Sequence, residues 1–472
     1  MPISVKVRAF ITAFATHIFM IHEISPTPDR QPDLVIHARY LAQVENTHLL
    51  EHHSVVISGQ RIIDILPSTL ARECYTPIES VELDEHLLIP GLINLHTHAA
   101  MSLMRGLADD LPLMLWLKEN IWPVEAAMVS RTFVHDGTLL ACAEMLRGGI
   151  TTFNDMYFFP DAAAEAAVKS GIRAALGITV MEFPNNYASD ASDYLHKGLA
   201  TLDQWRDHPL ISFCLAPHAP YSVSNTSFAR VQTLAAQLEL PIHIHIHETG
   251  DEIRQHLEEF GCRPLYRLFQ LGILGGQFIG VHAAHILEDE LELLARHNGS
   301  IAHCPASNLK LGSGIAPVSK MLAQGINVGL GTDGAASNNR LDILAEMRLA
   351  SLLAKGVTGN AAEISAWQAL YMATLGGAIA LGKERDIGSI TVGKLADLAA
   401  IRLNDFYLSP CYHPVSHLVH CAGRENVSHV WVGGKCRVSD KILIGLNTME
   451  LKNTIRLWQN RLVSCIRSGA AA

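Results

Sequence analysis

The sequence has no pair of cysteines at the C-x-x-C spacing, no excess of basic residues and no long uninterrupted apolar run. Its nine cysteines are an odd number scattered along 472 residues, which indicates reduced thiols in a cytoplasmic protein and argues against a disulfide framework or a zinc knuckle. The formal net charge of −10 argues against a nucleic-acid partner, which would need a basic face. We therefore expect a cytoplasmic protein that does not bind nucleic acid.

The longest apolar run near the start of the chain, Ile11–Ile21, is interrupted by His17. A run of this length is shorter than the ~20 apolar residues that cross a bilayer. We therefore expect no membrane association, and we expect residues 1–32 to be an N-terminal extension upstream of the first strand.

Charged residues make up 17% of the chain and hydrophobic residues 49%, a composition that supports a large buried core. Length alone suggests about three domains, although an α/β barrel can use ~250 residues as one domain. The unusual feature is histidine, with 25 residues against 36 lysines and arginines together. Imidazole is the commonest metal ligand in proteins, so the positions of these residues become the main question.

Short alternating apolar runs separated by turn residues occur at both ends of the chain, and this texture predicts β-strands. We expect residues 33–88 and 387–445 to form one small β-sandwich, followed by a C-terminal helix over 446–472. The strand-like segments are 33–39, 53–66 and 80–84 near the start and 388–390, 396–401 and 429–435 near the end.

The middle of the chain, residues 89–386, repeats an apolar strand, a polar loop and a helical stretch. Eight such units predict an α/β fold in which this region is a (β/α)8 TIM-like barrel, with the active site in the loops at the strand C-termini. The predicted strands are 92–96, 150–155, 174–180, 211–216, 242–247, 278–282, 300–303 and 328–332.

Metal-binding residue types stand at the ends of four of these strands. Alternate residues of a strand face the same side, so His96 and His98 can reach one ion. Each motif alone is weak, because an H-x-H pair is more often on the surface and Thr332-Asp333-Gly334 alone is a turn. Together they predict a catalytic divalent site of three imidazoles and a carboxylate. The residues at these strand ends are His96, His98, His243, His245, His247, Glu248, His282, His285 and Asp333.

The fifth strand offers three histidines on one face. His243 would lie deeper in the barrel as a buried, hydrogen-bonded side chain, and His247 would lie beyond the ion. We prefer His245 as the ligand, because the H-x-x-E spacing then leaves Glu248 above the metal as a general acid and base.

Four longer stretches extend this pattern: 96–117 (HTHAAMSLMRGLADDLPLMLWL), 216–222 (APHAPYS), 303–312 (HCPASNLKLG) and 331–339 (GTDGAASNN). With them, residues 33–445 resemble the amidohydrolase superfamily. Within it the chain is similar to the 5′-methylthioadenosine/S-adenosylhomocysteine deaminases of the triazine-hydrolase-like group.

The resemblance implies a role for each metal-site residue. His96, His98, His245 and Asp333 would hold one Zn²⁺ per subunit, with Fe²⁺ and Mn²⁺ left open. The metal would make hydroxide available near neutral pH. His282 would orient that hydroxide, Asp333 would accept its proton, and Glu248 would protonate the purine ring nitrogen.

The resemblance also implies substrate contacts. Glu125 is expected at the ribose hydroxyls, His218 near the purine or sugar, and Trp116 stacked against the nucleoside; Ser337, Glu248 and Asp333 complete the set. Without the resemblance, Glu125 would be interpreted as a solvated helix-cap carboxylate, Trp116 as a core aromatic and Ser337 as a loop cap.

Two sequence features refine these expectations. Binuclear relatives carry a lysine after the fourth strand, whereas here that strand ends Ala216-Pro-His218, which favours a single metal. Residues 177–190 contain no arginine or lysine to bind an amino-acid carboxylate, although relatives that accept S-adenosylhomocysteine tend to have arginines there.

We therefore expect hydrolytic deamination of 5′-methylthioadenosine to 5′-methylthioinosine and ammonia, with S-adenosylhomocysteine and adenosine as further candidate substrates. Alternatives are a deaminase or chlorohydrolase of another N-heterocycle, such as guanine, a triazine or a pterin, and a non-catalytic scaffold on the same fold. The intact set of metal-site residues argues against the scaffold. We also expect a homo-oligomer, the common default for cytoplasmic enzymes.

Overall fold

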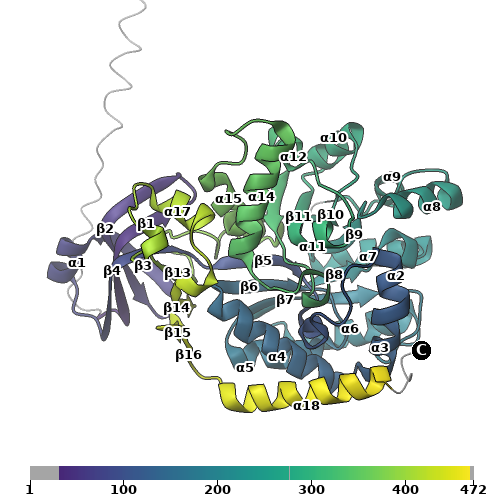
Figure 1. Cartoon of the computed structure of the whole chain (residues 1–472), viewed down its shortest axis with the longest axis horizontal. Coiled ribbons are helices and arrows are strands. Elements are labelled where there is room, and N and C mark those ends of the chain that lie inside the picture. The colour runs from purple at the N-terminus through teal and green to yellow at the C-terminus, as the bar shows by residue number, and fades with distance from the viewer. Residues whose placement is uncertain (1–30, 276, 468–472) are drawn as a thin grey trace, which may run out of the picture.

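The structure is a computed structural model that describes residues 31–275 and 277–467 (Figure 1). It contains two eight-stranded sheets. The N-terminal extension predicted over residues 1–32 lies outside the described residues up to residue 30, and so do residues 468–472 of the predicted C-terminal helix. Among the described residues, no helix has the length and apolar character needed to span a bilayer.

One sheet is the predicted barrel, and all eight predicted strands are present. Its strands follow one another in sequence order, and neighbouring strands pair in parallel. The strands are β5 (Leu92–Thr97), β6 (Ile150–Asp155), β7 (Arg173–Val180), β8 (Ile211–Pro217), β9 (Ile242–Ile246), β10 (Phe278–His282), β11 (Ser300–His303) and β12 (Asn327–Leu330).

Nearly every residue of these strands is buried, because side chains on one face fill the barrel and those on the other face pack under helices. The covering helices include α4 (Arg131–Arg147), α5 (Pro160–Ser170), α6 (Ala191–Trp205), α7 (Asn225–Leu238), α8 (Gly250–Phe260), α9 (Pro264–Gln270), α10 (Glu288–Arg296), α11 (Pro305–Lys310), α12 (Val318–Ala323), α14 (Ile343–Thr358), α15 (Ala366–Ala373) and α16 (Leu375–Ala380).

Shorter helical segments lie in the loops. They are η1 (Ala99–Met104), α2 (Leu113–Trp116), η2 (Leu117–Ile121) and α3 (Trp122–Met128) after β5, η3 (Pro220–Ser222) after β8, and α13 (Ala335–Asn338) after β12. These loops therefore supply the segments around the C-terminal ends of the strands, where a barrel carries its active site.

The barrel closes between its first and last strands through a side chain. The amide of Thr332 donates to Asn94 Oδ1 at 3.0 Å, and Asn94 Nδ2 donates to the Thr332 hydroxyl at 2.7 Å. The amide of Asp333 then donates to the carbonyl of His96 at 3.0 Å. This closure brings Asp333 beside the first histidine motif, although more than 230 residues separate them in sequence.

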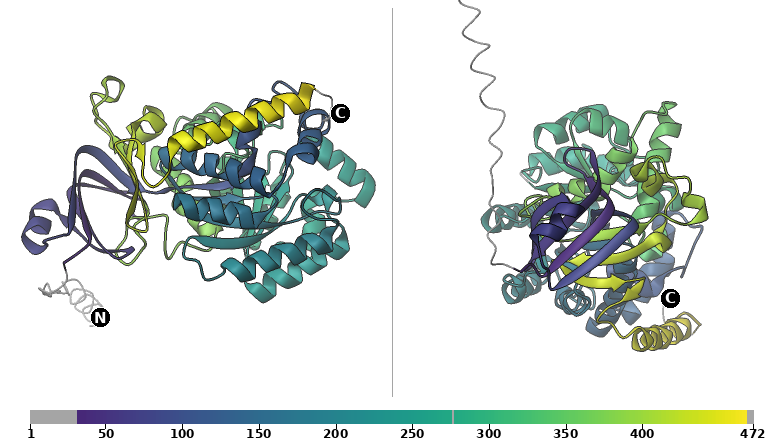
Figure 2. Two further views of the ribbon diagram at one scale, coloured as in Figure 1. Left: turned by 90° about the horizontal axis from the view of Figure 1, so that it is seen from below. Right: turned by 90° about the vertical axis from the view of Figure 1, so that its left-hand side faces the viewer.

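The second sheet takes strands from both ends of the chain, as the sequence predicts, and hydrogen bonding joins all eight in the order β16-β15-β14-β13-β4-β1-β2-β3. They are β1 (Leu34–Gln43), β2 (His48–Ser58), β3 (Arg61–Pro67), β4 (Glu79–Pro90), β13 (Leu398–Arg402), β14 (Val427–Val432), β15 (Lys435–Ser439) and β16 (Ile442–Leu443). This β domain lies at one end of the molecule (Figure 2).

Two details of the β domain differ from the sequence prediction. The segment 53–66 is two strands, because Gly59, with φ 60°, turns the chain between β2 and β3. Residues 388–390 were predicted as a strand, and this is wrong: they lie in neither sheet, and Ile390 instead packs into the apolar core of the β domain. A single buried isoleucine next to a glycine and a serine therefore resembled a short strand in the sequence, although these residues pair with no strand.

Three helices lie outside the barrel repeat: α1 (Ser68–Cys74), α17 (Pro414–His420) and α18 (Thr448–Arg467). The last of these crosses back from the β domain and runs along the barrel (Figures 1 and 2). Trp458 of α18 is buried, and its indole N–H donates to Asp136 of α4 at 2.8 Å. The C-terminal segment is thereby packed onto the barrel.

Candidate metal centre

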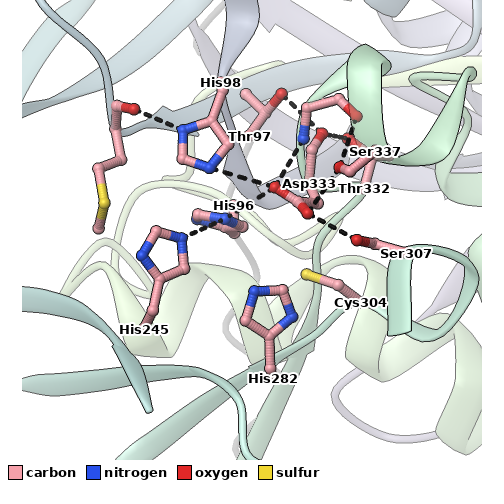
Figure 3. A network of polar contacts seen from close by, with 12 residues as sticks. His96, Thr97, His98, His245, His282, Cys304, Ser307, Thr332, Asp333 and Ser337 are labelled. Carbon is pink, nitrogen blue, oxygen red and sulfur yellow. Dashed lines mark hydrogen bonds and ion pairs between the residues drawn. The ribbon is translucent and has the colours of Figure 1, made fainter. Parts of the chain in front are cut away.

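Four imidazoles and one carboxylate converge at the C-terminal end of the barrel, in two groups of possible metal ligands that share His96 (Figure 3). One group is His96, His98 and His245, and the other is His96, His282 and Asp333. His96 and His98 come from the end of β5, His245 from β9, and Asp333 from the loop after β12. Asp333 Oδ1 lies 3.3 Å from His96 Nε2 and 3.2 Å from His98 Nε2, and His245 Nε2 lies 3.2 Å from His96 Nε2.

The second nitrogen of each ring fixes its orientation. His98 Nδ1 donates to the carbonyl of Met156 at 2.6 Å, and His245 Nδ1 donates to the carbonyl of His218 at 2.7 Å. A carbonyl oxygen only accepts, so Nδ1 carries a proton in both rings and Nε2 is the nitrogen that faces the centre. Metal-binding histidines are held in this way by partners outside the coordination shell.

The donor set therefore fits a divalent cation. His98 Nε2 lies 3.2 Å from Asp333 Oδ1 and His245 Nε2 lies 3.2 Å from His96 Nε2, so a cation placed among these atoms would have nitrogen and oxygen donors around it. Four ligands about 2.1 Å from a tetrahedral zinc lie about 3.4 Å from one another, close to the separations of 3.2 to 3.3 Å found here.

Both carboxylate oxygens of Asp333 accept hydrogen bonds from the protein. The amide of Gly334 donates to Oδ1 at 2.7 Å, while the hydroxyls of Ser307 and Ser337 donate to Oδ2 at 2.6 and 2.7 Å. The backbone of Asp333 is left-handed, with φ 61°. Such a conformation costs free energy in a residue with a Cβ, and it commonly marks a functional site. Ser337, predicted to contact substrate, thus uses its hydroxyl on the Asp333 carboxylate.

The electrostatics of the centre also suit a cation. Burial lowers the pKa of His96 to about 3, so this ring is neutral. Burial opposes ionisation of Asp333, but the hydrogen bonds and charges of His96 and His98 outweigh it and hold the pKa of Asp333 well below its usual range. Burial likewise lowers the pKa of His98, but the hydrogen bond and charge of Asp333 outweigh it and raise that pKa to about 9.

His282, predicted to orient the hydroxide, and Glu248, predicted to transfer protons, lie beside Asp333 and His245. His282 Nδ1 bonds the side-chain oxygen of Asn308 at 2.8 Å, and its ring stacks on His245 with centroids 5.5 Å apart. His282 Nε2 lies 3.9 Å from Glu248 Oε2. Burial raises the pKa of Glu248 above its ordinary value, which is the direction expected of a general acid.

The predicted substrate contacts lie at different places. His218 follows β8, and its ring lies 5.1 Å from that of His245. Glu125 on α3 accepts a hydrogen bond of 2.6 Å from the hydroxyl of Tyr157, whose ring lies 6.4 Å from that of His98. Trp116 is 5% exposed, packs in the main core, and donates its indole N–H to the carbonyl of Ala108. It has the environment of a core aromatic, and its stacking role stays a prediction.

The structure also gives positions to residues that had no role at the level of the sequence. His243 Nε2 lies 3.0 Å from His96 Nδ1 and so completes the environment of that ring. The H-x-H-x-H alternation on the fifth strand was the available signal, but it could not separate ligand from support. Asn308 and Ser307 carried no signal of their own, because their contacts depend on the β11–α11 turn.

Comparison with known proteins agrees with this geometry. The model of the amidohydrolase family matches residues 87–437. A protein of Saccharophagus degradans called 5-methylthioadenosine/S-adenosylhomocysteine deaminase is 44% identical over 438 residues, which cover 93% of this chain and 98% of that protein. A protein of the same name from Teredinibacter turnerae is 45% identical over 422 residues, covering 89% and 96%.

A solved structure is similar as well. The crystal structure of an adenosine deaminase from Xanthomonas campestris with bound zinc superposes with a TM-score of 0.91 at 44% identity, covering 92% of this chain and 99% of that one.

Proposed function

The chain belongs to the amidohydrolase family, and from this premise we propose that it is a metal-dependent hydrolase that deaminates an adenine nucleoside, with 5′-methylthioadenosine as the preferred substrate. The products are 5′-methylthioinosine and ammonia. The observation that carries the proposal is the part-buried Glu248 carboxyl, which lies 3.9 Å from His282 at the edge of the two groups of possible metal ligands that share His96.

One Zn²⁺ is the proposed metal, held by His96, His98, His245 and Asp333, with Fe²⁺ and Mn²⁺ as outcomes to test. When bound, the ion lowers the pKa of a water molecule so that hydroxide is available near neutral pH. The four side chains would offer one nitrogen or oxygen ligand each, and the water would take a further position on the ion.

The remaining chemistry belongs to the protein. His282, whose Nδ1 is held by Asn308, orients the attacking water through Nε2. Glu248 protonates the purine ring nitrogen, which makes the neighbouring carbon electrophilic. The Glu248 carboxylate then takes the hydroxyl proton of the adduct and passes it to the departing amine, and the proton held by Asp333 is released to solvent as Glu248 takes one up. Asp333 accepts the proton that the water loses. A C–O bond forms, the C–N bond breaks, and ammonia leaves.

The nucleoside contacts proposed here use residues around the same mouth. Glu125 would accept from the ribose hydroxyls, and its bond with Tyr157 leaves the second carboxylate oxygen for this purpose. His218 would contact the purine or sugar, since its ring lies next to that of His245. A buried carboxylate matched to hydroxyls would favour a nucleoside over a bare base, because an unmatched buried polar group is costly.

The preference for 5′-methylthioadenosine over S-adenosylhomocysteine rests on charge. Residues 177–190 contain Glu182 and Asp190 and no arginine or lysine. Lys197 contacts this stretch through the carbonyl of Tyr187, but its ammonium is already paired with Asp193 at 2.8 Å. A substrate carboxylate placed there would lack a cationic partner and would meet negative charge.

The test is an ammonia-release screen of the metal-loaded protein with adenosine, 5′-methylthioadenosine, S-adenosylhomocysteine, guanine and aminotriazines. We expect the largest kcat/KM for 5′-methylthioadenosine. A larger kcat/KM for S-adenosylhomocysteine would contradict the charge argument alone. Activity confined to guanine or triazines would overturn the nucleoside assignment, and inactivity of zinc-loaded protein on every compound would support a non-catalytic scaffold.

We also propose a cytoplasmic homo-oligomer. Cys142, Cys214 and Cys304 are buried and form no disulfide, and free thiols of this kind are typical of proteins in a reducing compartment. The net charge of −10 gives no support to a nucleic-acid partner. Light scattering coupled to gel filtration would measure the oligomeric state.

A further inference from the structure

The first turn of α8 carries a buried carboxylate that bonds the loop containing Glu248. Glu252 is 9% exposed. Its Oε2 accepts from the backbone N–H of Glu248 at 2.8 Å, and its Oε1 accepts from the backbone N–H of His247 at 3.1 Å. One side chain therefore bonds two consecutive amides, one of which belongs to the proposed proton donor.

The loop needs such an anchor because its conformation is strained. His247 has φ 49°, a left-handed conformation that is uncommon for a residue with a Cβ. The Glu248 carboxylate oxygen Oε2 lies 3.9 Å from His282 Nε2, which is longer than a hydrogen bond. The direction of the Glu248 side chain is therefore set mainly by its own backbone.

We propose that Glu252 is a positioning residue, which fixes the backbone of His247 and Glu248 and thereby aims the Glu248 carboxyl at the substrate. This inference rests on the proposed function of Glu248. It assigns Glu252 no contact with substrate or metal, and it attributes its effect on catalysis entirely to the two backbone hydrogen bonds.

The competing explanation is an ordinary helix cap. The Thr249 hydroxyl accepts from the Glu252 amide at 3.2 Å, so Thr249 and Glu252 have the spacing of a capping box. In a capping box the carboxylate serves the N-cap amide, whereas here its bonds extend to the two preceding residues. The two explanations differ in what the carboxylate does for catalysis, and variants can separate them.

The principal variant is Glu252→Gln, which keeps the shape but replaces one acceptor oxygen with an amide NH2 group that cannot accept from a backbone N–H. We expect kcat to fall about 10- to 100-fold, with KM within about twofold and the bound zinc unchanged. We also expect faster hydrogen–deuterium exchange in peptides spanning residues 246–250, a measurement that does not depend on the substrate.

Two further variants separate positioning from capping. Thr249→Ala weakens the cap but leaves the carboxylate, so it should lower the thermal midpoint while kcat stays within about twofold. Glu252→Asp keeps a charged residue suited to a helix N-terminus but is one methylene too short for both amides, so its kcat should fall as that of Glu252→Gln does. Glu258→Gln, at an exposed position of the same helix, is the matched control and should change nothing.

The outcomes are distinguishable. Wild-type kcat in folded, zinc-loaded Glu252→Gln and Glu252→Asp would overturn the positioning role while leaving the proposed deaminase intact. Equal loss of kcat in Thr249→Ala would also overturn it, in favour of a cap. A wild-type enzyme that releases no ammonia would contradict the proposed function, while the exchange measurement would still test the loop contact.

Discussion

Two groups of buried histidines in this protein have opposite environments. At the barrel mouth, His96 is fully buried and its Nε2 faces the Asp333 carboxylate and a second imidazole. In the β domain, His86 on β4 is 8% exposed, and neither ring nitrogen has a hydrogen-bond partner among the described residues. The neighbouring ring, that of His429, lies 6.3 Å away.

Burial has the same consequence in both places. It lowers the pKa of His96 to about 3 and that of His86 to about 4, so both rings are neutral at pH 7. Neutral imidazole is the form that binds metal, but a neutral ring without other ligands beside it does not make a metal site. The difference is the set of neighbours: at the mouth, the Nδ1 partners of His98 and His245 turn Nε2 of both rings toward the centre at which Asp333 lies.

Metal removal is expected to have the largest effect on activity, and this effect should be confined to the barrel mouth. Treatment with a chelator should abolish ammonia release, and added Zn²⁺ should restore it, because the water needs the ion to ionise near neutral pH. The β domain should be unaffected, so far-ultraviolet circular dichroism should change little. Full activity in protein shown to be metal-free would contradict the proposed mechanism.

Next in size is Glu248→Gln. Removal of a general acid and base typically costs about 10²- to 10⁴-fold in rate, so kcat should fall by that order while zinc remains bound. Steady-state kinetics and metal analysis of the same preparation provide the measurement. The matched control is Glu258→Gln, which should retain wild-type kcat; retention of activity in Glu248→Gln itself would exclude its proton-transfer role.

A smaller effect is expected from His243→Leu. The leucine removes the ring that contacts His96 Nδ1 at 3.0 Å, so His96 loses its orientation, and zinc affinity should fall about 10- to 100-fold. Competition with a chromogenic chelator measures this affinity. His86→Leu makes the same substitution in the β domain and should leave zinc affinity unchanged; equal losses in both variants would show that the effect is not specific to the mouth.

The smallest effect is on stability and concerns His86 itself. Because its pKa is about 4 in the folded protein against about 6.5 when unfolded, the unfolded chain binds the proton more readily. The free energy of unfolding should therefore fall as pH drops through this range, by about 3 kcal/mol at most. His86→Leu should flatten this part of the pH profile in urea unfolding; an unchanged profile would contradict the shift.

Much of the fold could be predicted because it depends on local patterns. The eight barrel strands are buried on both faces, so each is a short apolar run between polar loops, and that pattern is visible without the structure. The prediction failed at residues 388–390, where an apolar residue is buried without strand pairing. Most strands are both buried and hydrogen-bonded to a neighbouring strand, but an apolar pattern in the sequence indicates only that residues are buried.

The candidate site was predictable to the level of residue types at strand ends. His96, His98 and Asp333 were identified because strand C-termini of a barrel meet at one face. The environment of each was not, because the Met156 and His218 carbonyls, Asn308 and the Ser307 hydroxyl become neighbours only through turns distant in sequence. Trp116 illustrates the same limit, since only the structure reveals how deeply it is buried.

The sequence by itself determined the barrel, the participation of both chain ends in the second sheet, and the histidine and acidic residues available at the mouth. Tertiary structure alone decided which histidines converge and how each ring is turned. The reason is physical: hydrophobic periodicity is a local property, whereas a shared centre requires atoms from β5, β9 and the β12 loop to lie within a few ångströms of one another. Closure of the barrel through Asn94 and Thr332 brings those strand ends together.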